Sequence, residues 1–120
     1  MSDFRDLKIW QKAHSLTLKI YKLSKLLPSE EKYIIIDQTK RASISVELNI
    51  SEGYGRFHYS DEVNFLLNAR DSACEVQNCL LLIKDLHFKK ESISLFDEYT
   101  ELIKMINGFI RHKRDKKSNS

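Results

Sequence analysis

Glycine and proline are scarce in this sequence of 120 residues, which contains three glycines and one proline. Turn-rich β architectures use more of both, because tight turns need positive φ angles or the fixed φ of proline. β-branched residues occur only in short runs, whereas apolar residues recur at steps of three and four positions. These features favour long helices, and the chain length suits one domain.

Long apolar runs and cysteines are scarce as well. No stretch reaches the roughly 20 apolar residues that a membrane span needs, and Met1–Arg5 is not followed by the apolar run of a secretory signal. Cys74 and Cys79 are the only cysteines, and a five-residue separation directs two side chains to different sides of a helix. We therefore expect buried, reduced cysteines and a cytoplasmic protein.

Signatures of catalysis are missing too. The sequence has no nucleophile elbow, and its histidines lie too far apart to form a metal-binding pair such as HExxH: His14, His58, His87 and His112. Glu52 and Glu75 are expected near the core, but the Glu-x-x-His motifs of a di-metal bundle are absent. Salt bridges or helix caps explain these two acids better. The sequence thus predicts no enzymatic site, no metal and no cofactor.

Four helices are predicted, at about residues 6–27, 30–52, 61–86 and 92–112. Pro28 ends the first helix, and the acids Glu30 and Glu31 suit the positive start of the second. Gly53 and Gly55 mark the end of the second helix, and Ser60 is the expected N-cap of the third.

Helices of this length joined by short connections pack antiparallel to their neighbours. The expected fold is therefore all-α, a single up-down-up-down four-helix bundle over residues 1–112. Residues 113–120 are expected to form a basic, disordered tail.

Apolar residues form more stripes than one bundle core requires. On the first helix the core stripe is Ile9, Ala13, Leu16, Ile20, Leu23 and Leu27. Second apolar patches on the first three helices predict a subunit interface, although they would also fit a peripheral part of the core. The candidate interface residues are Leu7, Trp10, Leu18, Tyr21, Tyr33, Ile44, Leu48, Val63, Leu67 and Leu81, together with Cys74.

The segment Ser51–Arg56 contains two of the three glycines. It is not a phosphate-binding P-loop, because Gly-Lys-[Ser/Thr] and a preceding strand are missing. We expect a helix C-cap in which Gly53 or Gly55 takes a positive φ. An additional role is also open, in which Tyr54 stacks on a ligand and Arg56 contacts a phosphate or a neighbouring subunit.

Charge is distributed unevenly around a net value of +3. Residues 1–29 and 111–120 each carry +4, whereas residues 57–87 carry −3. One basic stripe lies on the first helix and a second cluster lies in the tail: Arg5, Lys8, Lys12, Lys19 and Lys22, then Arg111, Lys113, Arg114, Lys116 and Lys117. Repeated around an oligomer, these groups predict contact with the backbone of RNA or DNA without sequence specificity. A surface that docks an acidic partner protein is the alternative.

Several motifs follow one family's pattern in order. They are Asp6-Leu7-x-Ile9-Trp10-Gln11-Lys12-Ala13, Leu27-Pro28-x-x-Glu31-x-Tyr33, Gln38-x-Lys40-Arg41-Ala42, Asn49-Ile50-Ser51-Glu52-Gly53-Tyr54-Gly55-Arg56 and Phe65-x-x-x-Ala69-Arg70-x-Ser72-x-x-Glu75. Over about residues 4–110 the chain resembles bacterial four-helix-bundle proteins first associated with intervening sequences in 23S ribosomal RNA genes.

The resemblance implies an up-down bundle that assembles into a homopentamer. A relative of the family, the accessory protein of diversity-generating retroelements, is a basic pentamer that partners a reverse transcriptase and nucleic acid. The chain departs from the pattern at Ser51, where alanine is usual, and at Glu47, where a small residue or proline is usual. We interpret Asn49, Glu52 and Arg70 as an inner polar network that joins the second and third helices.

Overall fold

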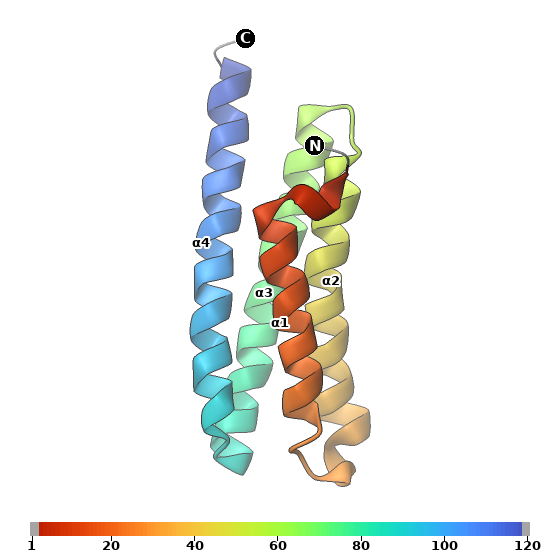
Figure 1. Cartoon of the computed structure of the whole chain (residues 1–120), viewed down its shortest axis with the longest axis vertical. Coiled ribbons are helices and arrows are strands. Elements are labelled where there is room, and N and C mark those ends of the chain that lie inside the picture. The colour runs from red at the N-terminus through yellow and green to blue at the C-terminus, as the bar shows by residue number, and fades with distance from the viewer. Residues whose placement is uncertain (1–2, 119–120) are drawn as a thin grey trace.

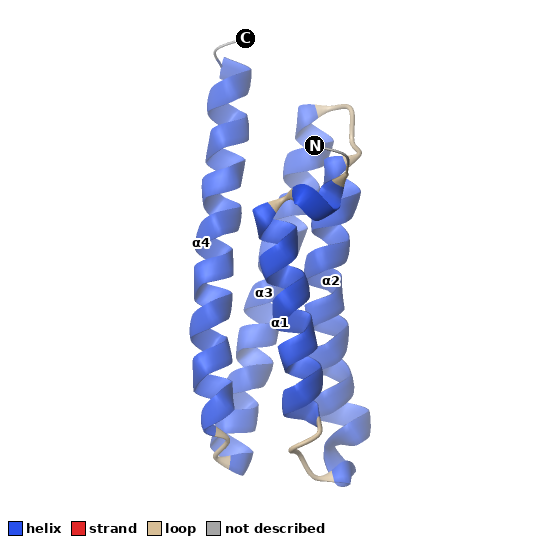
Figure 2. Ribbon diagram, in the orientation of Figure 1, coloured by secondary structure: helices blue, strands red, loops and turns tan. Residues whose placement is uncertain are grey.

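A computed structural model describes residues 3–118 as four antiparallel helices in a single bundle (Figures 1 and 2). Neighbours in the sequence pack side by side, and the last helix closes the bundle against the first. Within the described range there is no strand, which confirms the all-α bundle. The helices are α1 (Lys8–Ser24), α2 (Asp37–Tyr54), α3 (Tyr59–His87) and α4 (Lys90–Ser118).

The core consists of the apolar stripes that face one another inside the bundle. Every member of the stripe predicted on the first helix, from Ile9 to Leu27, is buried. On α4 the buried positions recur every three or four residues, as a helix with one inward face requires. Tyr99 of α4 is the largest fully buried side chain. These stripes hold the four helices together, mainly by removing apolar surface from water.

The connection between α1 and α2 differs from the predicted helix over 30–52. A 3₁₀ turn spans Ser29–Glu31, a π-helical turn spans Lys32–Ile36, and regular α-helix begins only at Asp37. The wider π turn places the adjacent residues Ile35 and Ile36 in the core and leaves Tyr33 and Ile34 exposed. α1 is also shorter than predicted at both ends, because Phe4–Asp6 form a separate 3₁₀ turn and the helix ends at Ser24 instead of Leu27.

The caps of α2 and α3 do not follow the predicted chemistry. Gly55 is the C-cap of α2, but its φ is −84°, and no glycine in residues 3–118 has a positive φ. The left-handed conformation is taken instead by Phe88, with φ 53°, at the end of α3. α3 begins at Tyr59 with His58 as N-cap, so Ser60 already lies inside the helix.

The basic segment after His112, which was predicted to be a disordered tail, is helical through Ser118. Lys113 pairs with Glu62 of α3 at 3.5 Å, and Lys117 lies 4.6 Å from the centre of the Tyr59 ring. Cations in the last turns also interact favourably with the negative end of the helix dipole. Asn119 and Ser120, the end of the predicted tail, lie outside the described residues.

Candidate interaction surfaces

The groove between α1 and α2 is bordered by aromatic and apolar side chains. His14 Nδ1 lies 3.0 Å from Glu47 Oε2, and the His14 ring stacks on Trp10 with 4.7 Å between ring centres. Further along, Lys40 Nζ of α2 lies 4.5 Å from the ring centre of Tyr21. These contacts show that the second apolar stripe predicted on α1 faces α2.

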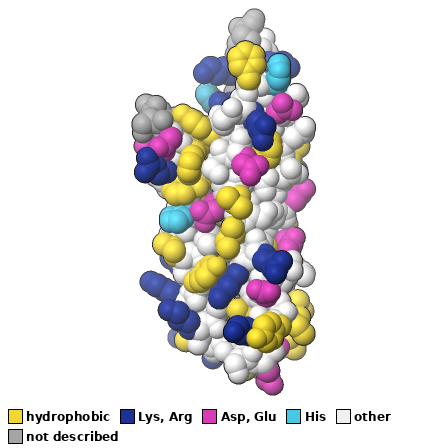
Figure 3. All heavy atoms as spheres, turned by 90° about the vertical axis from the view of Figure 1, so that its right-hand side faces the viewer, with side chains coloured by type: hydrophobic (Ala, Val, Ile, Leu, Met, Phe, Trp, Pro, Cys, Tyr) yellow, Lys and Arg dark blue, Asp and Glu magenta, His cyan; other side chains and the backbone are white. Residues whose placement is uncertain are grey.

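Three exposed aliphatic residues extend this surface outward. Leu18 follows His14 by one helical turn and is 54% exposed, and Leu48 follows Ile44 by one turn and is 51% exposed. In Figure 3, which views the side where α2 lies, hydrophobic side chains form a broken strip along the length of the molecule. We define the α1/α2 face as Trp10, His14, Leu18, Tyr21, Ile44 and Leu48.

A second, different apolar surface lies between α3 and α4. Arg70 donates a hydrogen bond to Asn107 at 3.0 Å, and Gln77 donates to the Phe96 carbonyl at 3.1 Å, so these positions face α4. The predicted interface residues of α3 lie on the same side by helical spacing. We define the α3/α4 face as Val63, Leu67, Cys74, Leu81, Ile93 and Phe96.

The two faces lie on opposite sides of the bundle. Each helix packs mainly on its neighbours in chain order, with α4 against α1, so the α1/α2 groove is opposite the α3/α4 groove. Glu98 of α4 pairs with Lys12 and Lys19 across the α1–α4 seam. Gln38 of α2 donates a hydrogen bond to Glu75 across the α2–α3 seam. These polar contacts lie between the two apolar faces, although the α1–α4 seam also contains Leu23, Leu26 and Leu95.

Not every predicted interface residue is available to a partner. Leu7 is a core residue, only 8% exposed, which corrects its assignment to an interface. Trp10, Val63 and Leu67 are partly buried against the core, so for these three the peripheral-core interpretation holds in part. Leu18, Tyr21, Ile44, Leu48, Leu81 and Tyr33 are exposed.

The basic stripe predicted on α1 is largely paired. Lys12 Nζ and Lys19 Nζ lie 3.2 and 2.9 Å from the same Glu98 oxygen, and Arg5 pairs with Asp3 at 2.6 Å. Partial burial acts to raise the pKa of Glu98, but the hydrogen bonds from Lys19 and Lys12 outweigh it and lower the pKa. Within residues 3–118, only Lys8 and Lys22 of the stripe form no ion pair.

The C-terminal part of α4 presents the clearest group of unpaired cations. This part of the helix extends beyond the ends of the other helices (Figure 1). Arg111, Arg114 and Lys116 are exposed and form no ion pair with any described residue. Lys113 and Lys117 instead contact α3, as described above.

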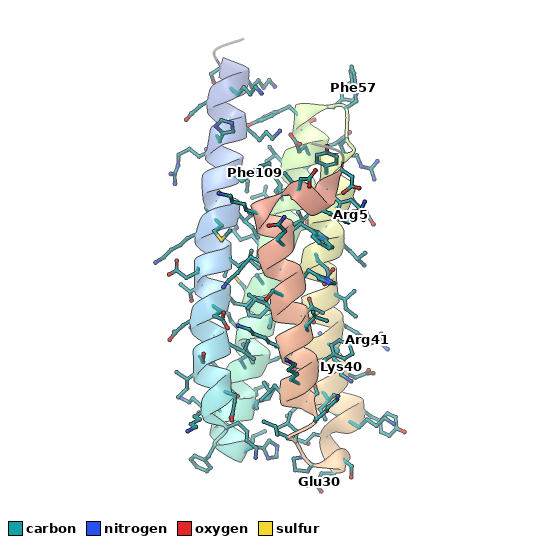
Figure 4. The ribbon with its side chains drawn as sticks, viewed as in Figure 1. Arg5, Glu30, Lys40, Arg41, Phe57 and Phe109 are labelled. Carbon is teal, nitrogen blue, oxygen red and sulfur yellow. The ribbon has the colours of Figure 1, made fainter. Side chains whose placement is uncertain are left out.

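Arg56 lies over the Phe65 ring, 4.5 Å from its centre, rather than extending into solvent. Phe57, which follows it, points away from the bundle (Figure 4) and is almost fully exposed. Phe57 was not among the residues predicted from the sequence. An aromatic residue just after a glycine-rich helix end, outside every predicted apolar stripe, could have indicated an exposed side chain.

The polar network predicted between α2 and α3 is only partly present. Asn49 donates to the Ser45 carbonyl within α2, and Ser45 Oγ contacts Ser72 Oγ of α3 at 2.8 Å. Arg70, however, joins α3 to α4 through Asn107, and Glu52 is exposed. Glu75 is exposed as well, which corrects the placement of both acids near the core.

Two buried groups lack the partners that polar atoms normally have. The Tyr99 hydroxyl and the Ser92 hydroxyl are buried without a hydrogen-bond partner among the described residues. Burial is the main cause that raises the pKa of Tyr99, and the charges of Glu47 and Glu98 act in the same direction. A neutral, weakly acidic phenol inside the core gives no sign of proton transfer at neutral pH.

The cysteines occupy different environments. Cys79 is buried and burial raises the pKa of its thiol, whereas Cys74 is exposed, contrary to the prediction that both are buried. Residues 3–118 contain no group of three or more His, Cys, Asp and Glu side chains placed to hold a metal ion. No helix in this range is long and apolar enough to cross a membrane.

The fold and these surfaces define an all-α bundle protein with two apolar surfaces, the α1/α2 face and the α3/α4 face. Residues 5–108 match the family model of the 23S rRNA-intervening sequence proteins, and the chain belongs to this family. This finding confirms the resemblance in the motifs.

A solved structure from Bacteroides thetaiotaomicron, a protein of unknown function from the S23 ribosomal protein family, is similar to the chain. Its TM-score is 0.78 at 25% sequence identity, and the match covers 85% of this chain and 97% of that one. No curated protein matches the chain. Neither the family description nor that of the solved structure mentions an enzymatic activity.

Proposed function

We propose that the chain is a non-enzymatic, self-associating binding module of the cytoplasm. In this proposal the α1/α2 face of one copy packs against the α3/α4 face of the next. The supporting observation is the pair of apolar faces on opposite sides of one bundle. Groups of exposed apolar side chains on a protein surface often mark interaction sites.

Two different faces favour a head-to-tail contact over a two-fold dimer. A two-fold dimer buries the same patch of both copies, whereas a head-to-tail contact between unlike faces closes into a ring when its rotation allows. Charge acts in the same direction. Residues 1–56 carry ten basic and seven acidic side chains, and residues 57–110 carry five basic and nine acidic ones. Opposite net charges on these two segments, +3 and −4, steer unlike faces together. We propose a pentamer, the assembly that the resemblance implies.

The assembled module would bind RNA or DNA through phosphate contacts. In each copy the free cations at the end of α4 form the contact surface, with Lys8 and Lys22 as lesser contributors. A ring repeats this group of cations once per copy, so their positive electrostatic fields add. Contacts with phosphates need no side chain that reads the bases. The family's description refers to 23S rRNA, which makes RNA the first ligand to test.

The experiment is light scattering on a size-exclusion column, at low and high salt, with and without a mixed single-stranded RNA. The proposal predicts an oligomer that binds RNA at low salt and releases it as salt rises. An oligomer that ignores RNA at low salt would overturn the nucleic-acid role. The basic end would then be tested against acidic proteins, the alternative kind of partner.

A further inference from the structure

The π-helical turn Lys32–Ile36 presents an apolar projection to solvent. Tyr33 is 79% exposed and Ile34 is 71% exposed, although both residues neighbour buried isoleucines. The only ring contact of Tyr33 among the described residues is with Lys32, whose Nζ lies 5.4 Å from the ring centre. A large aromatic side chain exposed on an irregular helical turn is typical of a residue that anchors an interface.

A cavity of about 160 Å³ opens on the α3/α4 face. Its walls are apolar except for one lysine and one serine: Leu80, Leu81, Lys84, Ser92, Ile93 and Phe96. Ser92 is only 1% exposed, and its hydroxyl has no hydrogen-bond partner among the described residues. Because that hydroxyl is buried, the surface that the cavity offers to a partner is apolar apart from Lys84, which suits an aromatic side chain.

The projection and the cavity lie at the same end of the bundle. Glu31 Oε2 in the α1–α2 connection lies 2.9 Å from His87 Nε2 at the end of α3, which ties the two connections together. Tyr33 follows Glu31 by two positions, and Lys84 precedes His87 by three. In Figure 4 the labelled Glu30 lies at this end, and Phe57 lies at the other.

We propose that the Tyr33 ring of one copy inserts into this cavity of the next copy, where it packs on Leu81, Ile93 and Phe96. This inference rests on the proposed head-to-tail assembly and identifies its anchor. In a ring whose axis runs parallel to the helices, the same end of the bundle lies side by side in neighbouring copies. Tyr33 belongs to residues 1–56, which carry a net charge of +3, and the cavity belongs to residues 57–110, which carry −4, so the contact also joins segments of opposite net charge.

Disulfide cross-linking tests the contact directly. The variant combines Tyr33→Cys and Ile93→Cys with Cys74→Ser, and leaves the buried Cys79 in place. Mild oxidation should produce a ladder of covalent multimers on a non-reducing gel. The matched control replaces Tyr33→Cys with Tyr54→Cys, because Tyr54 is an exposed tyrosine at the far end of α2. The control should give no ladder.

Light scattering on the same samples separates the two proposals. If the protein is an oligomer but Tyr33→Cys with Ile93→Cys cross-links no better than the control, the insertion of Tyr33 is overturned. The proposed head-to-tail assembly is not affected by that result. A monomer overturns the assembly itself. Circular dichroism of each variant confirms that it is folded, and a variant that does not fold is replaced by Leu81→Cys in place of Ile93→Cys.

Side-chain replacement gives an independent measurement. Tyr33→Ser should weaken self-association by roughly tenfold or more, as the loss of a buried aromatic anchor does. Tyr54→Ser should leave the association unchanged. Tyr33→Ser and Ile93→Ala should show coupling in a double-mutant cycle, since each removes one side of the same packing contact. Additive effects of these two changes would overturn the insertion of Tyr33 into the cavity.

Discussion

Gly53 of α2 lies directly against Phe65 of α3. A β-carbon built on Gly53 would stand 3.0 Å from the Phe65 Cβ and 3.4 Å from the Glu62 carbonyl oxygen. Both of these atoms are fixed to the α3 backbone, so they cannot move aside as the end of a long side chain could. The glycine is therefore explained by close helix packing rather than by a left-handed cap.

Gly53→Ala should destabilise the fold by about 1 kcal/mol. Alanine improves helix propensity by about 1 kcal/mol, but overpacking at a tight contact costs about 1–3 kcal/mol. Gly108→Ala is the control, because nothing lies within 4 Å of a β-carbon at that helical position. The control should gain up to about 1 kcal/mol. Urea denaturation at one protein concentration measures the free energy of unfolding of both variants. Equal increases would show that α2 and α3 do not pack closely at Gly53.

Tyr99→Phe should stabilise the fold by about 1 kcal/mol. The change removes a buried hydroxyl that has no hydrogen-bond partner among the described residues and keeps the ring that fills the core. Tyr21→Phe, at an exposed position, should have an effect near zero. A loss of stability in Tyr99→Phe would contradict the prediction and indicate a hydrogen bond to the hydroxyl, such as one through a bound water.

Glu98→Gln should lower the free energy of unfolding by about 0.5–1 kcal/mol at pH 7. Because Lys12 and Lys19 lower the pKa of Glu98 in the folded chain, the pairing stabilises the fold above about pH 4.3, the ordinary value for glutamate. That stabilisation is lost as the pH falls through the lowered pKa.

Thermal unfolding between pH 7 and pH 3 measures this difference between the wild type and Glu98→Gln. The difference in stability between the wild type and Glu98→Gln should disappear toward pH 3 and become smaller in high salt. Glu101→Gln is the control, because its ion pair with Lys104 is exposed. A gap that stays constant with pH would mean that the lost stability comes from packing and not from charge.

The three free cations of α4 should govern the salt dependence of RNA binding. Replacing Arg111, Arg114 and Lys116 by glutamine should reduce the slope of log K against log salt by about 2 per bound chain, at about 0.7 for each lost contact with a single strand. Fluorescence anisotropy across a salt series measures the slope. Lys12→Gln with Lys19→Gln is the control pair, since both lysines pair with Glu98. An equal reduction in the control would argue against the end of α4 as the main contact surface.

Periodicity predicted the helices and the core well, because a bundle needs an inward stripe every three or four residues. The buried positions from Ile9 to Leu27 followed from spacing alone. Helix ends were harder to predict. The π turn at Lys32–Ile36 and the left-handed Phe88 depend on how the connections pack, and the residue types at these positions do not signal them.

The candidate surfaces were predicted in part. Spacing identified the apolar face of α1, but it could not show that Glu98, far away in sequence, neutralises Lys12 and Lys19. In the same way, Arg70 of α3 was predicted to join a polar network with α2, whereas its hydrogen-bond partner Asn107 lies on α4. A helical wheel gives the direction of a side chain and leaves open which charge stands opposite, because that depends on tertiary packing.

Self-association through the two faces is the central claim, and light scattering of one variant tests it most directly. Leu48→Glu places a charge on the α1/α2 face, and Leu82→Glu places one on a comparably exposed leucine that belongs to neither face. We predict an oligomer for the wild type and Leu82→Glu, and a folded monomer for Leu48→Glu. A wild-type chain that runs as a monomer, or a Leu48→Glu variant that keeps the wild-type mass, would contradict the account.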